Sequence, residues 1–214
     1  MAANPLDTGR LQLEAEARDI EEGLERSTQR ERIAFDCKFA VRIRDLRRSL
    51  LDSHPQVVHF SGHGDGPEGI ILEDDQGESV SVETLALANL FELHKANVEC
   101  VVLNACYSEE QAQAIAQHIP VVIGMADSVA DETARVFAVA FYDALGAGTT
   151  YEEAFLHGRN AIELHALGEE HLPILIARQL AIPQASPAGD ERVGVTEVPE
   201  ATEATIKLSR HQWL

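Results

Sequence analysis

The sequence predicts an α/β domain built around a mainly parallel sheet. Three short segments are apolar, rich in β-branched residues and bounded by Pro, Gly or polar residues, which is typical of buried strands. These segments are QVVHF (56–60), ECVVLNAC (99–106) and PVVIGMA (120–126). Helical patterns separate them, and strands that alternate with helices form a mainly parallel sheet. Ligands and reacting groups in such sheets gather beyond the carboxyl ends of the strands.

The remaining elements follow from the spacing of apolar residues and from turn residues. Apolar residues three and four apart predict helices within 11–26, 40–54, 82–95, 109–119, 131–148 and 150–167. Short apolar or alternating runs predict strands within 32–37, 70–74, 79–81 and 172–177. Pro55 ends the second helix, and Thr150 with Glu153 forms a capping-box pattern at the start of the last one.

Length and composition predict one domain with an appendage. The chain has 214 residues, of which 45% are hydrophobic, enough for a sizeable core. We expect the domain at 1–182 and an acidic tail rich in Pro, Ala and Thr at 183–214, with IKLSRHQWL as an end that could dock. Without an apolar run of about 18 residues or a signal-peptide layout, we expect a cytoplasmic protein with no membrane partner.

The charge and the cysteine content exclude several classes of function. The net charge is −19, and residues 51–214 carry all of it because ten basic and ten acidic residues cancel in 1–50. Nucleic acid is therefore excluded as a partner, since phosphate binding needs clustered Lys and Arg. The acidity fits either solubility or an attraction to basic peptides. Three cysteines without metal-type spacing predict neither a disulfide framework nor a metal site.

A histidine between two glycines follows the first buried strand. GDGPEG (64–69) matches a dinucleotide-binding pattern, but an apolar β-like run follows it where that site needs a helix. The glycines Gly62 and Gly64 instead let the backbone turn sharply around His63 and approach a ligand. We therefore interpret His63 as the residue that carries the chemistry, and Gly62 and Gly64 as the residues that shape the backbone around it.

Cys106 ends the second buried strand, so it should lie at the same sheet edge as His63. A thiol becomes a nucleophile when an imidazole takes its proton. Backbone N–H groups around Gly64 and Cys106 could bind a developing oxyanion. Two simpler interpretations stay open, in which Cys106 is a core thiol and His63 a turn residue.

HFSGHG, followed about forty residues later by VVLNAC, resembles the caspase-like cysteine peptidases, which include caspases, metacaspases, legumains, gingipains and separase. The bacterial CHAT branch is the most similar, over residues 4–180, including NPLDTGRLQLEAEARDI and VVIGMADSVADETARVFAVAFYDALGAG. The resemblance implies a three-layer α/β/α sandwich, His63 as general base or acid, Cys106 as nucleophile and Gly64 in the oxyanion hole. It implies no metal or organic cofactor. Relatives begin with an apolar strand, which should be very short or absent here because only three residues precede Asn4.

The resemblance also carries a functional expectation. It implies an endopeptidase that cleaves after Arg or Lys in a bacterial signalling or defence pathway. A partner protein or a nucleotide-type messenger would activate it, since a sensing domain is not apparent in the sequence. Asp65, Asp127 and Asp131 are candidates for binding a basic P1 residue, or else a turn, a loop and a helix-start residue. The alternatives are an interaction module without turnover and a flavodoxin-like ligand-binding domain.

Overall fold

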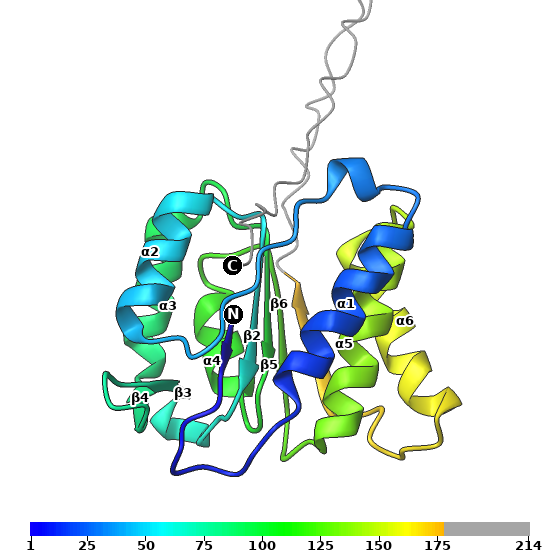
Figure 1. Ribbon diagram of the computed structural model, residues 1–214. Coiled ribbons are helices and arrows are strands. Elements are labelled where there is room, and N and C mark those ends of the chain that lie inside the picture. The colour runs from blue at the N-terminus through cyan, green and yellow to red at the C-terminus, as the bar shows by residue number, and fades with distance from the viewer. Residues whose placement is uncertain (178–214) are drawn as a thin grey trace, which may run out of the picture.

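A five-stranded sheet forms the middle layer of the computed structural model, which describes residues 1–177 (Figure 1). The strand order is β1-β2-β5-β6-β7. The strands are β1 (Ala2–Ala3), β2 (Val57–Gly62), β5 (Cys100–Asn104), β6 (Val121–Met125) and β7 (Pro173–Ala177). The first four are parallel and β7 is antiparallel to β6. The mainly parallel α/β architecture predicted from the sequence is confirmed.

Helices cover both faces of this sheet (Figure 1). One layer contains α1 (Leu13–Arg26), α5 (Asp131–Gly146) and α6 (Tyr151–Leu164), and the other contains α2 (Ile43–Ser53), α3 (Thr84–His94) and α4 (Glu109–Ile115). A hairpin of β3 (Ile70–Glu73) and β4 (Ser79–Val82) lies beside the second layer, and η1 (Arg30–Arg32) and η2 (Gly66–Glu68) are single 3₁₀ turns. The α/β/α sandwich implied by the resemblance is therefore present.

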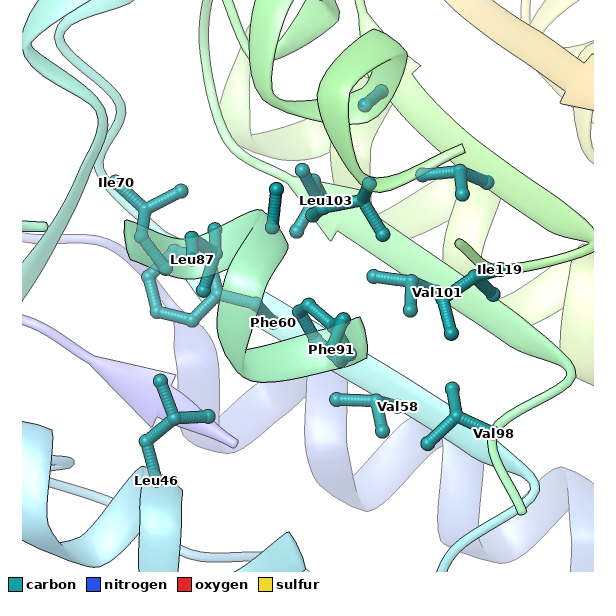
Figure 2. Close-up of a cluster of buried hydrophobic side chains, with 14 of the residues drawn as sticks. Leu46, Val58, Phe60, Ile70, Leu87, Phe91, Val98, Val101, Leu103 and Ile119 are labelled. Carbon is teal, nitrogen blue, oxygen red and sulfur yellow. The ribbon is translucent and has the colours of Figure 1, made fainter. Parts of the chain in front are cut away.

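The sheet separates two hydrophobic cores, because successive side chains of a strand point to opposite faces. Figure 2 shows one core, in which Val58 and Phe60 of β2 and Val101 and Leu103 of β5 lie with Leu87 and Phe91 of α3. The alternate strand residues pack on the other face against the aromatic side of α5, in a cluster that includes Val57, Val102, Ile123, Phe137 and Phe141. The sheet is buried on both faces, which explains why its central strands are continuous apolar runs.

Two predictions at the β1 edge have different outcomes. The first strand is indeed very short, with only Ala2 and Ala3 pairing with Ser61 and Gly62. The predicted strand at 32–37 is wrong, because η1 ends at Arg32 and the chain then runs without a regular strand. Ile33 forms only an isolated bridge, and no named strand of residues 1–177 includes this segment. The alternation in RIAFDC instead reflects the packing of Ile33 and Phe35 against the core on the α5 side of the sheet. The predicted boundary at 182 and the tail lie outside the described residues.

Within residues 1–177, no helix has the length and apolar character required to cross a bilayer.

Candidate active site

The pairing of β2 with β5 leads His63 and Cys106 to the same edge of the sheet. Ser61 is opposite Asn104 in the parallel register, and His63 and Cys106 each lie two residues beyond that pair. The loops that follow the two strands touch. A methyl group added to Gly64 would overlap the carbonyl oxygen of Cys106, so only glycine permits this close approach of the two backbones.

The backbone around His63 is held by the β3–β4 hairpin. The carbonyl of His63 accepts a hydrogen bond of 3.0 Å from the amide of Ile71, and the amide of Asp65 donates to Gly69 at 3.0 Å. Gly64 forms an antiparallel bridge with Ile70 between these two bonds. Segment 63–65 is thereby attached to the start of β3.

The imidazole of His63 is oriented by a backbone carbonyl that the sequence analysis did not identify. Its Nε2 lies 2.7 Å from the carbonyl oxygen of Gly9. Because a carbonyl can only accept, Nε2 carries the proton, and Nδ1 of the neutral ring is left as a proton acceptor. A base needs this tautomer if it takes a proton through Nδ1. A backbone carbonyl has no side-chain signature, so nothing in the sequence could have indicated Gly9.

The loop at 4–12 that contains Gly9 is bound to the same hairpin. The amide of Leu6 donates to the carbonyl of Gly77 at 2.9 Å. The hydroxyl and amide of Ser79 donate to the carboxylate of Asp7 at 2.7 and 2.9 Å. The hairpin therefore holds both the backbone of His63 and the loop that orients its ring.

Cys106 is half-buried against the loop that follows β6. Its sulfur lies 3.5 Å from the amide nitrogen of Val129, 3.7 Å from the carbonyl oxygen of Val129 and 3.8 Å from the hydroxyl of Ser128. The other two thiols have different surroundings. Burial raises the pKa of Cys100, which is fully buried, and burial also raises the pKa of Cys37. Neither is poised to react as a thiolate at neutral pH.

The three candidate substrate-binding aspartates occupy different positions. Asp127 is exposed near Cys106, and its backbone carbonyl accepts a 3.2 Å hydrogen bond from the amide of Tyr107, the residue after Cys106. The amide of Ser128, followed by the hydroxyl of Tyr107, holds the pKa of the Asp127 carboxyl below its usual value. Asp131 accepts the amide of Gln12 at 3.2 Å, so its carboxylate already binds the start of α1. Asp65 is exposed at the start of η2.

A buried carboxylate, also missed by the sequence analysis, lies beneath this edge. Glu16 of α1 accepts the hydroxyl of Ser61 at 2.9 Å and the side-chain amide of Asn104 at 3.1 Å. Nε2 of His59 lies 3.1 Å from the same carboxylate. The sequence did contain a sign of this burial. Glu16 falls three residues after Leu13 and four before Ile20, on the buried side of α1. A carboxylate at a core position needs polar partners.

Electrostatics keep Glu16 ionised in the folded protein. Burial alone would raise its pKa, but the nearby imidazole of His59 and the hydrogen bonds from Ser61 and Asn104 outweigh burial and place the pKa below its ordinary value. A group with a depressed pKa stabilises the fold above its unfolded-state pKa, and this contribution is lost as pH falls through the folded-state pKa.

We therefore expect Glu16 to contribute to acid unfolding. The free energy of unfolding should be steady near neutral pH and fall below about pH 4.5, the ordinary value for a glutamate. Urea unfolding of wild type and Glu16→Gln between pH 3 and 7 would measure this, and the variant should show the smaller fall. Parallel pH curves for the two proteins would contradict it.

Comparison with known proteins agrees with this architecture. The family model described as the CHAT domain matches residues 2–166. A protein of Gillisia limnaea named "Probable protease" is 24% identical over 170 residues, which cover 77% of this chain and 30% of that protein. The chain thus spans less than a third of the length of this relative. Because the family model matches well over half of the sequence, the chain belongs to the CHAT domain family, the caspase-like family that its His-Gly and Asn-Ala-Cys motifs resemble.

Proposed function

We propose that this protein is a cysteine endopeptidase that uses His63 and Cys106 as a catalytic dyad. One observation carries the proposal: the loops after β2 and β5 meet at Gly64 and Cys106, while Gly9 fixes the tautomer of the His63 ring. The name of the distant relative from Gillisia limnaea is consistent with peptidase chemistry. No metal or organic cofactor is needed for the reaction proposed.

The reaction would proceed in two stages. The thiol of Cys106 gives its proton to Nδ1 of His63, and the sulfur attacks the substrate carbonyl carbon. The N–H groups of Gly64 and Cys106 would bind the oxyanion of the tetrahedral intermediate. His63 then returns the proton to the leaving amine, which frees the new N-terminus. Water, deprotonated by His63, hydrolyses the acyl-enzyme and regenerates the thiol.

We further propose that the enzyme cleaves after Arg or Lys. Asp127 carries its negative charge beside Cys106, and its pKa is lowered rather than raised. A guanidinium or ammonium at P1 would form a charge-assisted pair with this carboxylate. Asp131 and Asp65 remain candidates, and the acidic charge of residues 51–214 would attract basic peptides as well.

Replacement of Asp127 should therefore change specificity more than turnover. In Asp127→Asn, kcat/KM for an Arg substrate should fall about 10- to 100-fold relative to a norleucine substrate, the scale of a hydrogen bond to a charged group. Asp52→Asn is the matched control, because Asp52 is exposed on α2 and belongs to neither of the two loops. A preference for Arg that survives in Asp127→Asn would move the assignment to Asp131 or Asp65.

Activation is proposed to come from outside the described residues. A partner protein or a nucleotide-type messenger would switch the enzyme on in a bacterial signalling or defence pathway in the cytoplasm. These proposals rest on the family resemblance, because the dyad and its loops include no evident sensing element.

A fluorogenic peptide panel varied at P1 tests the proposed function. Wild type and Cys106→Ala are compared with and without lysate from cells that carry the native neighbouring genes. Cleavage after Arg or Lys by wild type alone supports the proposal, and cleavage that requires lysate supports an activator. Full activity of Cys106→Ala would refute the mechanism. Silence in every condition would favour a caspase-fold interaction module instead.

A further inference from the structure

The buried carboxylate of Glu16 joins the two strands that lead to the dyad. Its Oε2 accepts the hydroxyl of Ser61 on β2, and its Oε1 accepts the side-chain amide of Asn104 on β5. Ser61 and Asn104 are opposite each other in the sheet register. Each is the second residue before a member of the dyad. One carboxylate is therefore bonded to both strands at the point where they leave the sheet.

The same carboxylate connects these strands to the element that orients His63. Glu16 lies in the first turns of α1, and the loop before α1 supplies the Gly9 carbonyl that accepts from Nε2 of His63. The amide of Asn104 also donates to the carbonyl of Ala134 in α5 at 3.1 Å. Helix α1, both strand ends and α5 thus converge on one polar cluster, made of Glu16, His59, Ser61 and Asn104.

Stabilisation of the fold does not by itself explain why these four polar side chains are buried together. A buried charge with its partners is often no more stabilising than well-packed apolar side chains of similar volume. A polar network can, however, fix one arrangement of the segments that it joins. The two bonds that Glu16 accepts from Ser61 and Asn104 do this here, while Oδ1 of Asn104 and the ring nitrogens of His59 are buried without a hydrogen-bond partner in the described residues. The segments joined here are those whose spacing controls proton transfer between sulfur and imidazole.

We propose that Glu16 is a positioning residue, which sets the spacing of the strand ends that carry His63 and Cys106 and so the efficiency of proton transfer between them. The inference rests on the proposed function, since it assumes a working dyad. Glu16 does not touch the substrate in this view, so its loss should lower kcat and leave KM nearly unchanged.

The test measures alkylation of Cys106 by iodoacetamide, because this small probe reports on the thiol and its base without a peptide-binding pocket. The second-order rate at Cys106 is followed by mass spectrometry in wild type, His63→Ala, Glu16→Gln, Ser61→Ala and Ile20→Val. Glu16→Gln keeps the side-chain volume, and Ser61→Ala removes a single hydroxyl. Ile20→Val trims the same buried side of α1 without removing a polar group, so it controls for a general loss of stability.

We expect Glu16→Gln to slow alkylation about tenfold or more, as a small misplacement of reacting groups can. Ser61→Ala should slow it less, and Ile20→Val should match wild type even if its unfolding temperature falls. Where a peptide is cleaved, kcat should follow the same order. If folded Glu16→Gln and Ser61→Ala were alkylated at the wild-type rate, the inference would be overturned, but the proposed dyad would not be affected. Equal rates in wild type and His63→Ala would overturn the dyad, and the inference with it.

Discussion

A peptidyl electrophile with Arg at P1 will modify Cys106 and leave Cys37 and Cys100 unmodified. The difference follows from the surroundings of the three thiols. Burial raises the pKa of both Cys37 and Cys100, so the reactive thiolate is scarce at both sites. Cys106 is half-buried at the sheet edge where its loop meets that of His63. Peptide mapping by mass spectrometry after labelling at neutral pH measures the extent of modification at each of the three cysteines.

The same labelling separates a catalytic thiol from a merely accessible one. Removal of the base in His63→Ala should slow modification of Cys106 about 10²- to 10⁴-fold, the usual contribution of general base catalysis. The control electrophile is the same peptide with Asp in place of Arg at P1, which the proposed pocket should reject. Equal labelling of all three cysteines, or no effect of His63→Ala, would show that Cys106 is an ordinary thiol.

If His63 and Cys106 act as the proposed dyad, Gly64→Ala should be the most damaging substitution that leaves both of them in place. The new methyl would overlap the carbonyl oxygen of Cys106, so one of the two backbones must move. Overpacking of this kind costs about 1–3 kcal/mol of stability. A shift of about 1 Å between reacting groups can cost about 100-fold in rate. We therefore expect kcat/KM to fall by about two orders of magnitude while the protein still unfolds cooperatively.

Thermal unfolding by circular dichroism and peptide hydrolysis, measured on the same preparation of Gly64→Ala, decide this prediction. Ala138→Gly serves as a control for a substitution of similar size at a buried helical position of α5, away from the loop contact. If folded Gly64→Ala retained activity within threefold of wild type, the close approach of the two loops would have no part in catalysis.

Regular elements were predictable because the pattern of apolar residues records burial. The central strands are apolar on both faces, as fully buried strands must be, and Thr150 with Glu153 caps α6 as its pattern indicated. The incorrect strand at 32–37 shows the limit, since alternation cannot reveal whether a partner strand is present. Ile43 shows another limit. Its spacing from Leu46 and Leu50 is typical of one buried helix face, but it lies at the first position of α2 and is 44% exposed.

The candidate site was only partly visible in the sequence. His63, Gly64 and Cys106 could be placed because they follow buried strands, whose ends meet at one edge of a parallel sheet. The Gly9 carbonyl could not be placed, because any residue supplies the same backbone group. Glu16 could have been suspected from its position on the apolar side of α1, but its partners come from two strands far along the chain. Contacts of that kind depend on tertiary packing.

The bonds made by the β3–β4 hairpin have a consequence for local opening of the protein. The hairpin holds the backbone of His63 through Ile71 and the loop of Gly9 through Gly77 and Ser79. Segments joined in this way open as one cooperative unit. Amide hydrogens of Leu6, Ile71 and Ser79 should then exchange with solvent deuterium at a common rate. Because Ile70 and Leu72 of this hairpin are buried in the core shown in Figure 2, opening of the hairpin would expose part of that core and displace the imidazole in the same event.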